Sequence, residues 1–254
     1  SFLSIEQWGT IVLENMEPAF RWCHIMVYNA SDAPNLENVT SMHAMFEGTD
    51  VFNGDLNNWD VSNVTDMSYL FDGAQSFNGA IEDWTVSNVT NMNNMFSFTE
   101  SFNRDIGNWD THQVNSMAYM FFSATAFNQD IGNWNVGNVT NMANMFLNAP
   151  VFNQDLNDWN VGNVVNMSGM FAHATSFDGN ISNWNVTKVT SMMEMFFSAG
   201  SFNQDISQWQ TESLQHMDFM FEEASSFNQN INGWNTSKVS SMLTVFSGAT
   251  SFCL

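Results

Sequence analysis

Basic residues are scarce in this sequence of 254 residues. Only four Lys or Arg residues stand against 26 Asp or Glu residues, which gives a formal net charge of −22 at pH 7. Because contacts to phosphate groups need clustered Lys and Arg side chains, this balance argues against nucleic-acid binding and against an anionic membrane surface. The sequence also lacks any apolar run near the roughly 20 residues of a membrane-spanning helix. We therefore expect neither a nucleic-acid partner nor direct membrane insertion.

Cysteine is equally rare, with Cys23 near one end of the sequence and Cys253 near the other. A stacked repeat of the kind described next would hold these residues beyond the about 7 Å between Cα atoms that a disulfide allows, so we expect free thiols. Only 12% of residues are charged, and amide and hydroxyl side chains supply most of the polarity. That composition is typical of extracellular or cell-surface proteins. Because the sequence stops at SFCL, in mid-repeat, we expect it to be a segment of a longer protein.

A period of 25 residues, without insertions, governs the sequence from about residue 36 to residue 254. The stretch NVTDMSYLF at 63–71 returns as NVTNMNNMF at 88–96 and as NVTNMANMF at 138–146. Three residue types return in fixed columns: Phe at 52, 77, 102, 127, 152, 177, 202, 227 and 252, Trp at 59, 84, 109, 134, 159, 184, 209 and 234, and Met at every 25th position from 42 to 242. Uniform spacing predicts a solenoid of about nine coils, each in contact only with its neighbours. The Phe, Trp and Met columns are then core.

Within one coil the pattern predicts a short parallel strand followed by a short helix. Trp59 and Val61 alternate with polar Asp60 and Ser62, as in a half-buried strand. The apolar residues that follow recur every three or four positions, which is helical spacing: Val64, Met67, Leu70, Phe71 and Ala74. The fold class expected is therefore an α/β solenoid.

The consensus FNxDIxxWxVxNVTxMxxMFxxA resembles that of the BspA-type leucine-rich repeat surface proteins, over about residues 36–254. The preceding segment 1–35 is similar to the entry segment of such repeats, and we expect it to be an N-terminal cap. The resemblance implies a right-handed, leucine-rich-repeat-like solenoid that is secreted or held on the cell surface and serves adhesion or the binding of proteins or glycans.

Outward positions of the expected strand are the candidate binding residues. Two polar columns flank the Trp column and would form a flat face of amides and carboxylates: Asn58, Asp60, Asp83, Asp110, Asn133, Asn135, Asp158, Asn160, Asn183 and Asn185. Solenoids commonly bind partners along such faces. A face that is only solvated is the equally weighted alternative.

A column of Asp residues is the one candidate for a cofactor. Asp105, Asp130 and Asp155 occupy consecutive coils. Their carboxylates either accept hydrogen bonds within local turns, which we favour, or bridge neighbouring coils through Ca²⁺, which prefers oxygen ligands. The Asn of the NVT motif, as in Asn63 and Asn88, is expected to form an amide ladder or cap that satisfies backbone groups.

No pattern predicts an enzyme. The five His residues share no column, and no Ser or Cys stands in a nucleophile motif. Two non-enzymatic functions follow: a surface module that binds an extracellular protein or glycan through its polar face, or a structural spacer that self-associates into a filament or surface layer.

Overall fold

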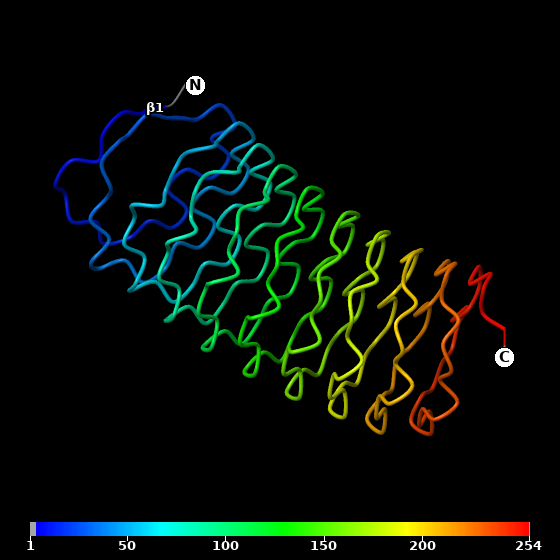
Figure 1. Ribbon diagram of the computed structural model, residues 1–254. Coiled ribbons are helices and arrows are strands. Elements are labelled where there is room, and N and C mark those ends of the chain that lie inside the picture. The colour runs from blue at the N-terminus through cyan, green and yellow to red at the C-terminus, as the bar shows by residue number, and fades with distance from the viewer. Residues whose placement is uncertain (1–3, 254) are drawn as a thin grey trace.

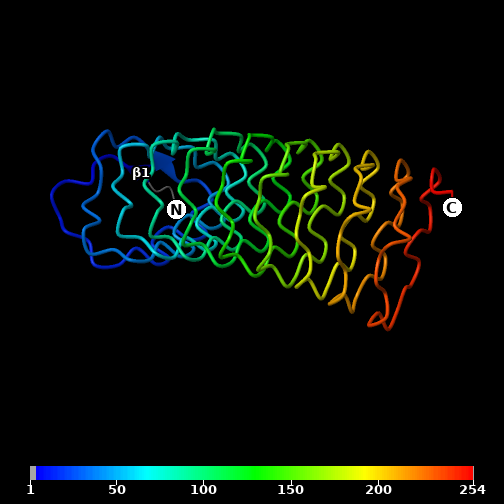
Figure 2. The same ribbon diagram turned by 60° about the horizontal axis from the view of Figure 1, so that its bottom comes forward.

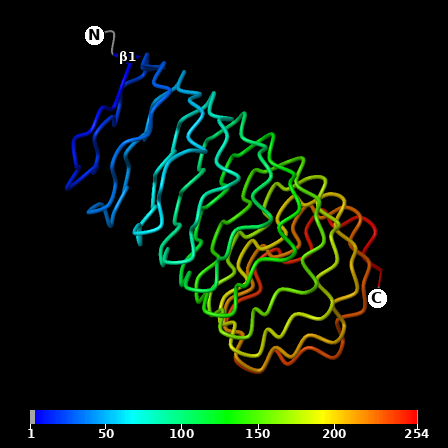
Figure 3. The same cartoon turned by 60° about the vertical axis from the view of Figure 1, so that its left-hand side comes forward.

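The computed structural model describes residues 4–253, which form one elongated stack of coils with the two termini at opposite ends (Figure 1). Equivalent residues of consecutive coils pair with each other, as in the series Ser41, Asp66, Asn91 and Ser116. Successive coils also turn gradually about the long axis (Figures 2 and 3). The predicted solenoid of 25-residue repeats is confirmed.

Ladders of aromatic rings fill the centre of the stack. The two Phe residues of one coil lie face to face, with the ring centroids of Phe71 and Phe77 3.9 Å apart, and each stacks on its counterpart in the next coil, as Phe71 does on Phe96 at 5.7 Å. The Trp column stacks in the same way, and Trp84 lies 6.3 Å from Trp109 with an interplanar angle of 8°. Phe71, Phe77 and Phe96 are fully buried. Burial of a large apolar side chain contributes about 1.5–3 kcal/mol, so these ladders are the main stabilising feature of every coil.

The helix expected at 64–74 is absent, and no helix occurs among residues 4–253. The N–H groups at alternate positions donate instead to carbonyl oxygens of the next coil, at 2.8–3.0 Å: Met67 to Asn91, Tyr69 to Asn93, Phe71 to Met95 and Gly73 to Ser97. Between them, the N–H groups of Leu70 and Asp72 donate three residues back. This run of tight turns buries every third or fourth side chain, as a helix would, so the apolar spacing could not separate the two. The Asn, Val and Thr residues of the motif are poor helix formers.

The strand expected around Trp59 is also absent. The N–H groups of Trp59 and Val64 donate three residues back, to Leu56 and Val61, so two turns enclose the extended residues between them. The only two strands assigned among residues 4–253 lie before the repeats: β1 (Ser4–Ile5) pairs in parallel with β2 (Val27–Tyr28). In the repeats each coil pairs with the next through one isolated bridge, at the position of Asp66 and Asn91. The strand pairing expected around Trp59 is therefore wrong, and the one bridged column lies within the segment expected to be a helix.

Residues 4–35 contain an irregular coil that packs on the end of the stack. Phe20 stacks on Phe46 with ring centroids 5.5 Å apart, and Trp8 meets Trp59 edge-on at 5.4 Å. The hydroxyl oxygen of Tyr28 accepts the indole N–H groups of both Trp8 and Trp59. These contacts cover the first rings of the aromatic ladders. Cys23 and Cys253 are free thiols, as predicted.

The run of turns places two residues of each coil in the left-handed region of backbone space. One column passes through Tyr69 (φ 59°) and Asn94 (φ 56°), and the other through Gly73 (φ 71°) and Phe98 (φ 54°). Left-handed backbone is unfavourable for any residue with a Cβ atom and easy for glycine. Because alternate backbone N–H groups donate to the next coil, the residues at these two positions adopt this conformation whatever their type.

Gly73→Ala should lower the free energy of unfolding by about 1–2 kcal/mol, measured by denaturant titration. An added Cβ at Gly73 would meet only ordinary contacts, with the nearest atoms of Gly48 at 3.6 Å, so the loss would come from the backbone alone. Gly200→Ala is the matched control: its added Cβ also finds its nearest atom at 3.6 Å, but Gly200 has no positive φ. The control should be neutral or stabilising by up to about 1 kcal/mol. Equal effects of the two substitutions would contradict the conformational argument.

Candidate functional site

All ten candidate binding residues are exposed, on either side of the buried Trp column. In the column that begins at Asp60, most side chains stabilise a turn, because an oxygen of the side chain accepts the backbone N–H two residues later. This bond joins Asp60 to Ser62, Asp110 to His112, Asn135 to Gly137, Asn160 to Gly162 and Asn185 to Thr187, at 3.1–3.3 Å. Such bonds are the usual role of Asp and Asn in turns. One oxygen of each of these side chains is therefore already engaged.

Electrostatics agree with this structural role at Asp60. Hydrogen bonds from the side chain and the backbone N–H of Ser62 hold the pKa of the Asp60 carboxyl below its ordinary value. Ser207 lowers the pKa of Asp205 in the same way. A carboxylate that accepts hydrogen bonds is favoured in its charged form.

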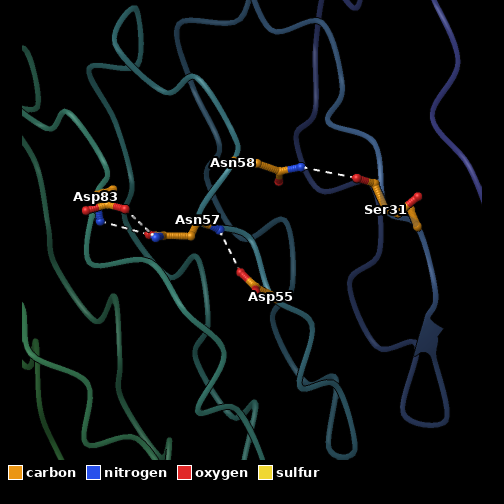
Figure 4. A pocket seen from close by; sticks show the side chains of 6 residues that line it. Ser31, Asp55, Asn57, Asn58 and Asp83 are labelled. Carbon is orange, nitrogen blue, oxygen red and sulfur yellow. Dashed lines mark hydrogen bonds between the residues drawn. The ribbon is translucent and has the colours of Figure 1, made fainter.

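The second candidate column, which begins at Asn58, lines hollows in the surface. The first hollow has a volume of about 410 Å³ and is lined by six residues: Ala30, Ser31, Asp55, Asn57, Asn58 and Asp83. Figure 4 shows Asn57 between Asp55 and Asp83: its amide nitrogen donates to the Asp83 carboxylate at 2.6 Å, and its amide oxygen accepts the Asp83 backbone N–H at 2.8 Å. Asn58 reaches the other way and donates to the carbonyl oxygen of Ser31 at 3.4 Å.

Two further hollows lie farther along the stack, one at the same repeat positions and one, near its C-terminal end, at positions that match only in part. One, of about 190 Å³, is lined by Asp130, Gly132, Asn133, Asp155, Asn157 and Asp158. Another, of about 330 Å³, is lined by Asn228, Gln229, Asn230, Asn232 and Cys253. We call these three hollows together the hollow row. The structure thus brings Asn58, Asp83, Asn133 and Asp158 together with the Asp column, which the sequence analysis treated as a separate set.

The residue two positions after the Asp column was missed by the sequence analysis. Asn57, Asn157 and Asn232 line the hollow row, and Gly132 stands at this position in the fourth coil. The Asp two residues earlier could have identified them. Its side-chain oxygen accepts the backbone N–H of the residue two positions later, and this bond fixes the backbone there.

The three calcium candidates act as turn acceptors. One carboxylate oxygen of each accepts a backbone N–H at 2.9–3.0 Å: Asp105 from Gly107, Asp130 from Gly132 and Asp155 from Asn157. The favoured interpretation, local turn bonding, is confirmed. Within residues 4–253 no three His, Cys, Asp or Glu side chains are grouped so that they could hold a metal ion. Calcium binding at Asp105, Asp130 and Asp155 stays a prediction.

Asn side chains connect the coils, as predicted for the NVT motif. The amide nitrogen of Asn88 donates to the carbonyl oxygen of Ser62 in the preceding coil at 2.8 Å, and Asn138 does the same to His112 at 2.7 Å. A second amide ladder, not predicted, uses the Asn of the FN motif: the oxygen of Asn128 accepts the backbone N–H of Asn153 at 2.9 Å. These bonds lie at the surface and tie each coil to the next in a fixed register.

A Ser and a His side chain lie within hydrogen-bond distance at one place. His43 Nδ1 lies 2.8 Å from the hydroxyl oxygen of Ser68. Ser68 is only 3% exposed, so its hydroxyl is not accessible to a substrate. The pair joins two neighbouring coils.

One carboxyl in the fold carries an unsatisfied buried oxygen. Asp72 Oδ1 has no hydrogen-bond partner among the described residues. Burial raises the pKa of Asp72 to about 6. The nearby negative charge of Glu47 raises this pKa further, whereas a hydrogen bond from Ser97 and the positive charge of Arg21 lower it. Arg21 donates to Glu47 at 2.8 Å, so its charge is shared with that neighbour.

Asp72→Asn should raise the free energy of unfolding at pH 7 and have little effect at pH 4. The folded protein binds the Asp72 proton more tightly than the unfolded chain, whose carboxyl has a pKa near 3.8. The stability contributed by the protonated form is therefore present below about pH 4 and is lost as the pH rises to about 6. Denaturant titrations between pH 4 and 8 would measure the difference between the variant and the natural chain.

Asp158→Asn is the control for this experiment, because it removes the same charge from an exposed carboxylate. A pH-dependent gain that is equal in the two variants would come from the net charge of the chain and not from the burial of Asp72.

Among the described residues no helix has the length and apolar character that a bilayer span requires.

Comparison with known proteins extends over nearly the whole chain. No curated protein and no solved structure matches the chain. The family described as "Mycoplasma protein of unknown function, DUF285" matches three overlapping segments, residues 2–97, 76–180 and 154–254. Together the three matches span residues 2–254, and the chain belongs to the DUF285 family.

Proposed function

We propose that the chain is a non-enzymatic binding module that holds an extended extracellular protein or glycan along the hollow row. The observation that carries this proposal is the repetition of one hollow at equivalent positions of two separate parts of the stack, with a third hollow that shares two of these positions. A partner that lies along the row would meet similar groups every few coils. Several weak contacts, held at fixed positions on one rigid solenoid, together bind an extended partner tightly without a deep pocket.

The chemistry of the row favours hydrogen bonding over apolar contact. Amide groups offer donors and acceptors together, as at Asn133 and Asn157, and carboxylates such as Asp158 accept only. Such groups suit the hydroxyls of a glycan or the backbone of an extended peptide. The net charge of −22 opposes a polyanionic partner.

Composition and family resemblance support the same function. The similarity of the repeat consensus to BspA-type leucine-rich repeat proteins, together with the low fraction of charged residues, favours an extracellular or cell-surface protein. Within this proposal the residues in contact with the partner are Asn58, Asp83, Asn133, Asp158 and Asn183, whereas Asp60 and its column support the backbone.

Lys substitutions along the row should abolish binding. The test variant combines Asn58→Lys, Asn133→Lys and Asn232→Lys, one in each hollow of the row, and adds three positive charges. The control variant combines Ser76→Lys, Ser101→Lys and Ser201→Lys, which are also exposed and add the same charge at a position outside the row. Both variants are compared with the natural chain on an array of immobilised glycans and on a panel of extracellular matrix proteins, with circular dichroism and thermal unfolding as checks of the fold.

We expect the natural chain and the control variant to bind the same probe, and the row variant to bind at least tenfold more weakly, because bulky cations would fill the hollows. Equal binding by all three proteins would place the contact elsewhere. Binding to no probe, combined with end-to-end assembly in analytical ultracentrifugation, would overturn the proposal in favour of a structural filament.

A further inference from the structure

Aromatic side chains gather on the run of turns, at positions where the core does not need them. Tyr69, Phe98 and Tyr119 are 37%, 44% and 37% exposed. Phe122 joins the last two, with its ring centroid 4.6 Å from that of Phe98 and 5.8 Å from that of Tyr119, both edge-on. We call Phe98, Tyr119 and Phe122 the aromatic edge.

The backbone at this edge makes the choice of aromatic residues unexpected. Phe98 and Tyr119 have φ angles of 54° and 60°, in the left-handed region that is unfavourable for bulky side chains. Gly73 and Asn148 stand at the Phe98 position of other coils, and Asn94 and Asn144 stand at the Tyr119 position, where Tyr69 and Phe219 are also aromatic. Gly and Asn adopt this conformation more easily and would fold as well. Edge-on packing among the three rings recovers only part of the loss, so a contact outside the chain explains them better than folding does.

The charges of the described chain indicate what such a contact would be. Its cations lie elsewhere or are engaged: Arg21 pairs with Glu47, Arg104 lies 3.6 Å from Glu82, and Lys188 donates to Asn163. None of the four Lys or Arg residues stands at the turn positions of the aromatic edge.

Acidic residues, in contrast, occupy those same turn positions in other coils: Asp72, Glu194, Glu222 and Glu223. Exposed rings on a chain with a net charge of −22 attract cations, because the face of an aromatic ring is itself negative. Arg and Lys side chains combine a cation with a flat or flexible apolar stem that packs on rings.

We propose that the aromatic edge binds a Lys- or Arg-bearing extended segment of a protein partner, whose cations lie over the rings of Phe98, Tyr119 and Phe122. This contact uses different positions of the repeat from the hollow row and does not depend on it. Electrostatic attraction by the whole chain would bring the segment to the surface, and the rings would decide where it stays.

A labelled peptide tests the proposal directly. The probe is a fluorescein-labelled peptide of alternating Arg and Ser, and its control has Gln in place of every Arg. Binding is measured by fluorescence anisotropy at about 0.15 M salt, where long-range attraction is largely screened. The edge variant combines Phe98→Ser, Tyr119→Ser and Phe122→Ser. The control variant combines Val51→Ser, Val151→Ser and Val165→Ser, which also removes exposed apolar side chains without a change of charge.

We expect the edge variant to bind the Arg peptide about tenfold more weakly than the natural chain, and the control variant to bind it equally well. Thermal unfolding identifies any variant that fails to fold. In that case Phe98→Asn, which copies the residue type at position 148, tests the same contact without a new backbone demand.

Three results would overturn the proposal. Unchanged binding by a folded edge variant would show that the net charge alone attracts the peptide. Equal affinity for the Gln peptide would assign the rings to an uncharged partner. Dimerisation of the natural chain in sedimentation, lost in the edge variant, would make the edge an interface between two copies.

Discussion

The hydrogen bonds from alternate N–H groups of one coil to the carbonyl oxygens of the next determine most other features of this structure. In the coil of Tyr69 they run from Met67, Tyr69, Phe71 and Gly73. They join each coil to its neighbour, prevent the helix that the apolar spacing suggested, and place two residues per coil in the left-handed region. They also set the separation at which the Phe rings of consecutive coils stack, 5.7 Å for Phe71 and Phe96.

Polar side chains complete the connection between coils without a regular sheet. The Trp84 indole donates to the Leu56 carbonyl oxygen, Asn88 donates to Ser62, and Asn128 accepts from Asn153, in each case across a coil boundary. The Trp84 bond satisfies a carbonyl that would be costly to bury alone, whereas the two Asn bonds lie at the surface. The same bonds engage much of the polar surface, which is why only some of the conspicuous Asn and Asp columns stay available to a partner. The Asp60 column supports turns, and the Asn58 column lines hollows.

The two proposed contacts therefore depend on different kinds of evidence. The hollow row uses the repeated Asp column, as at Asp55, together with a variable position at which Asn57 and Gly132 stand. The aromatic edge lies at variable positions, since Phe98 stands where other coils have Gly, Asn, Ser, His or Glu, and Tyr119 stands where they have residues from Gly and Asn to Tyr and Phe. A repeat protein can vary such turn positions freely, because the aromatic ladders beneath them, as at Phe96 and Phe121, carry the stability.

The amino-acid sequence by itself determined the 25-residue period, the buried Phe, Trp and Met columns and the free Cys residues. Large apolar residues at equal spacing predict a stack in which each side chain is covered by the equivalent side chains of neighbouring coils. It could not distinguish a helix from a run of turns at 64–74, since both bury every third or fourth side chain. Only the tertiary structure decided that question, because the N–H groups of Met67 and Tyr69 find their acceptors in the neighbouring coil rather than in their own. It also decided that Asn57, Asn58 and Asp83 share one hollow, which arises between coils and in no single repeat.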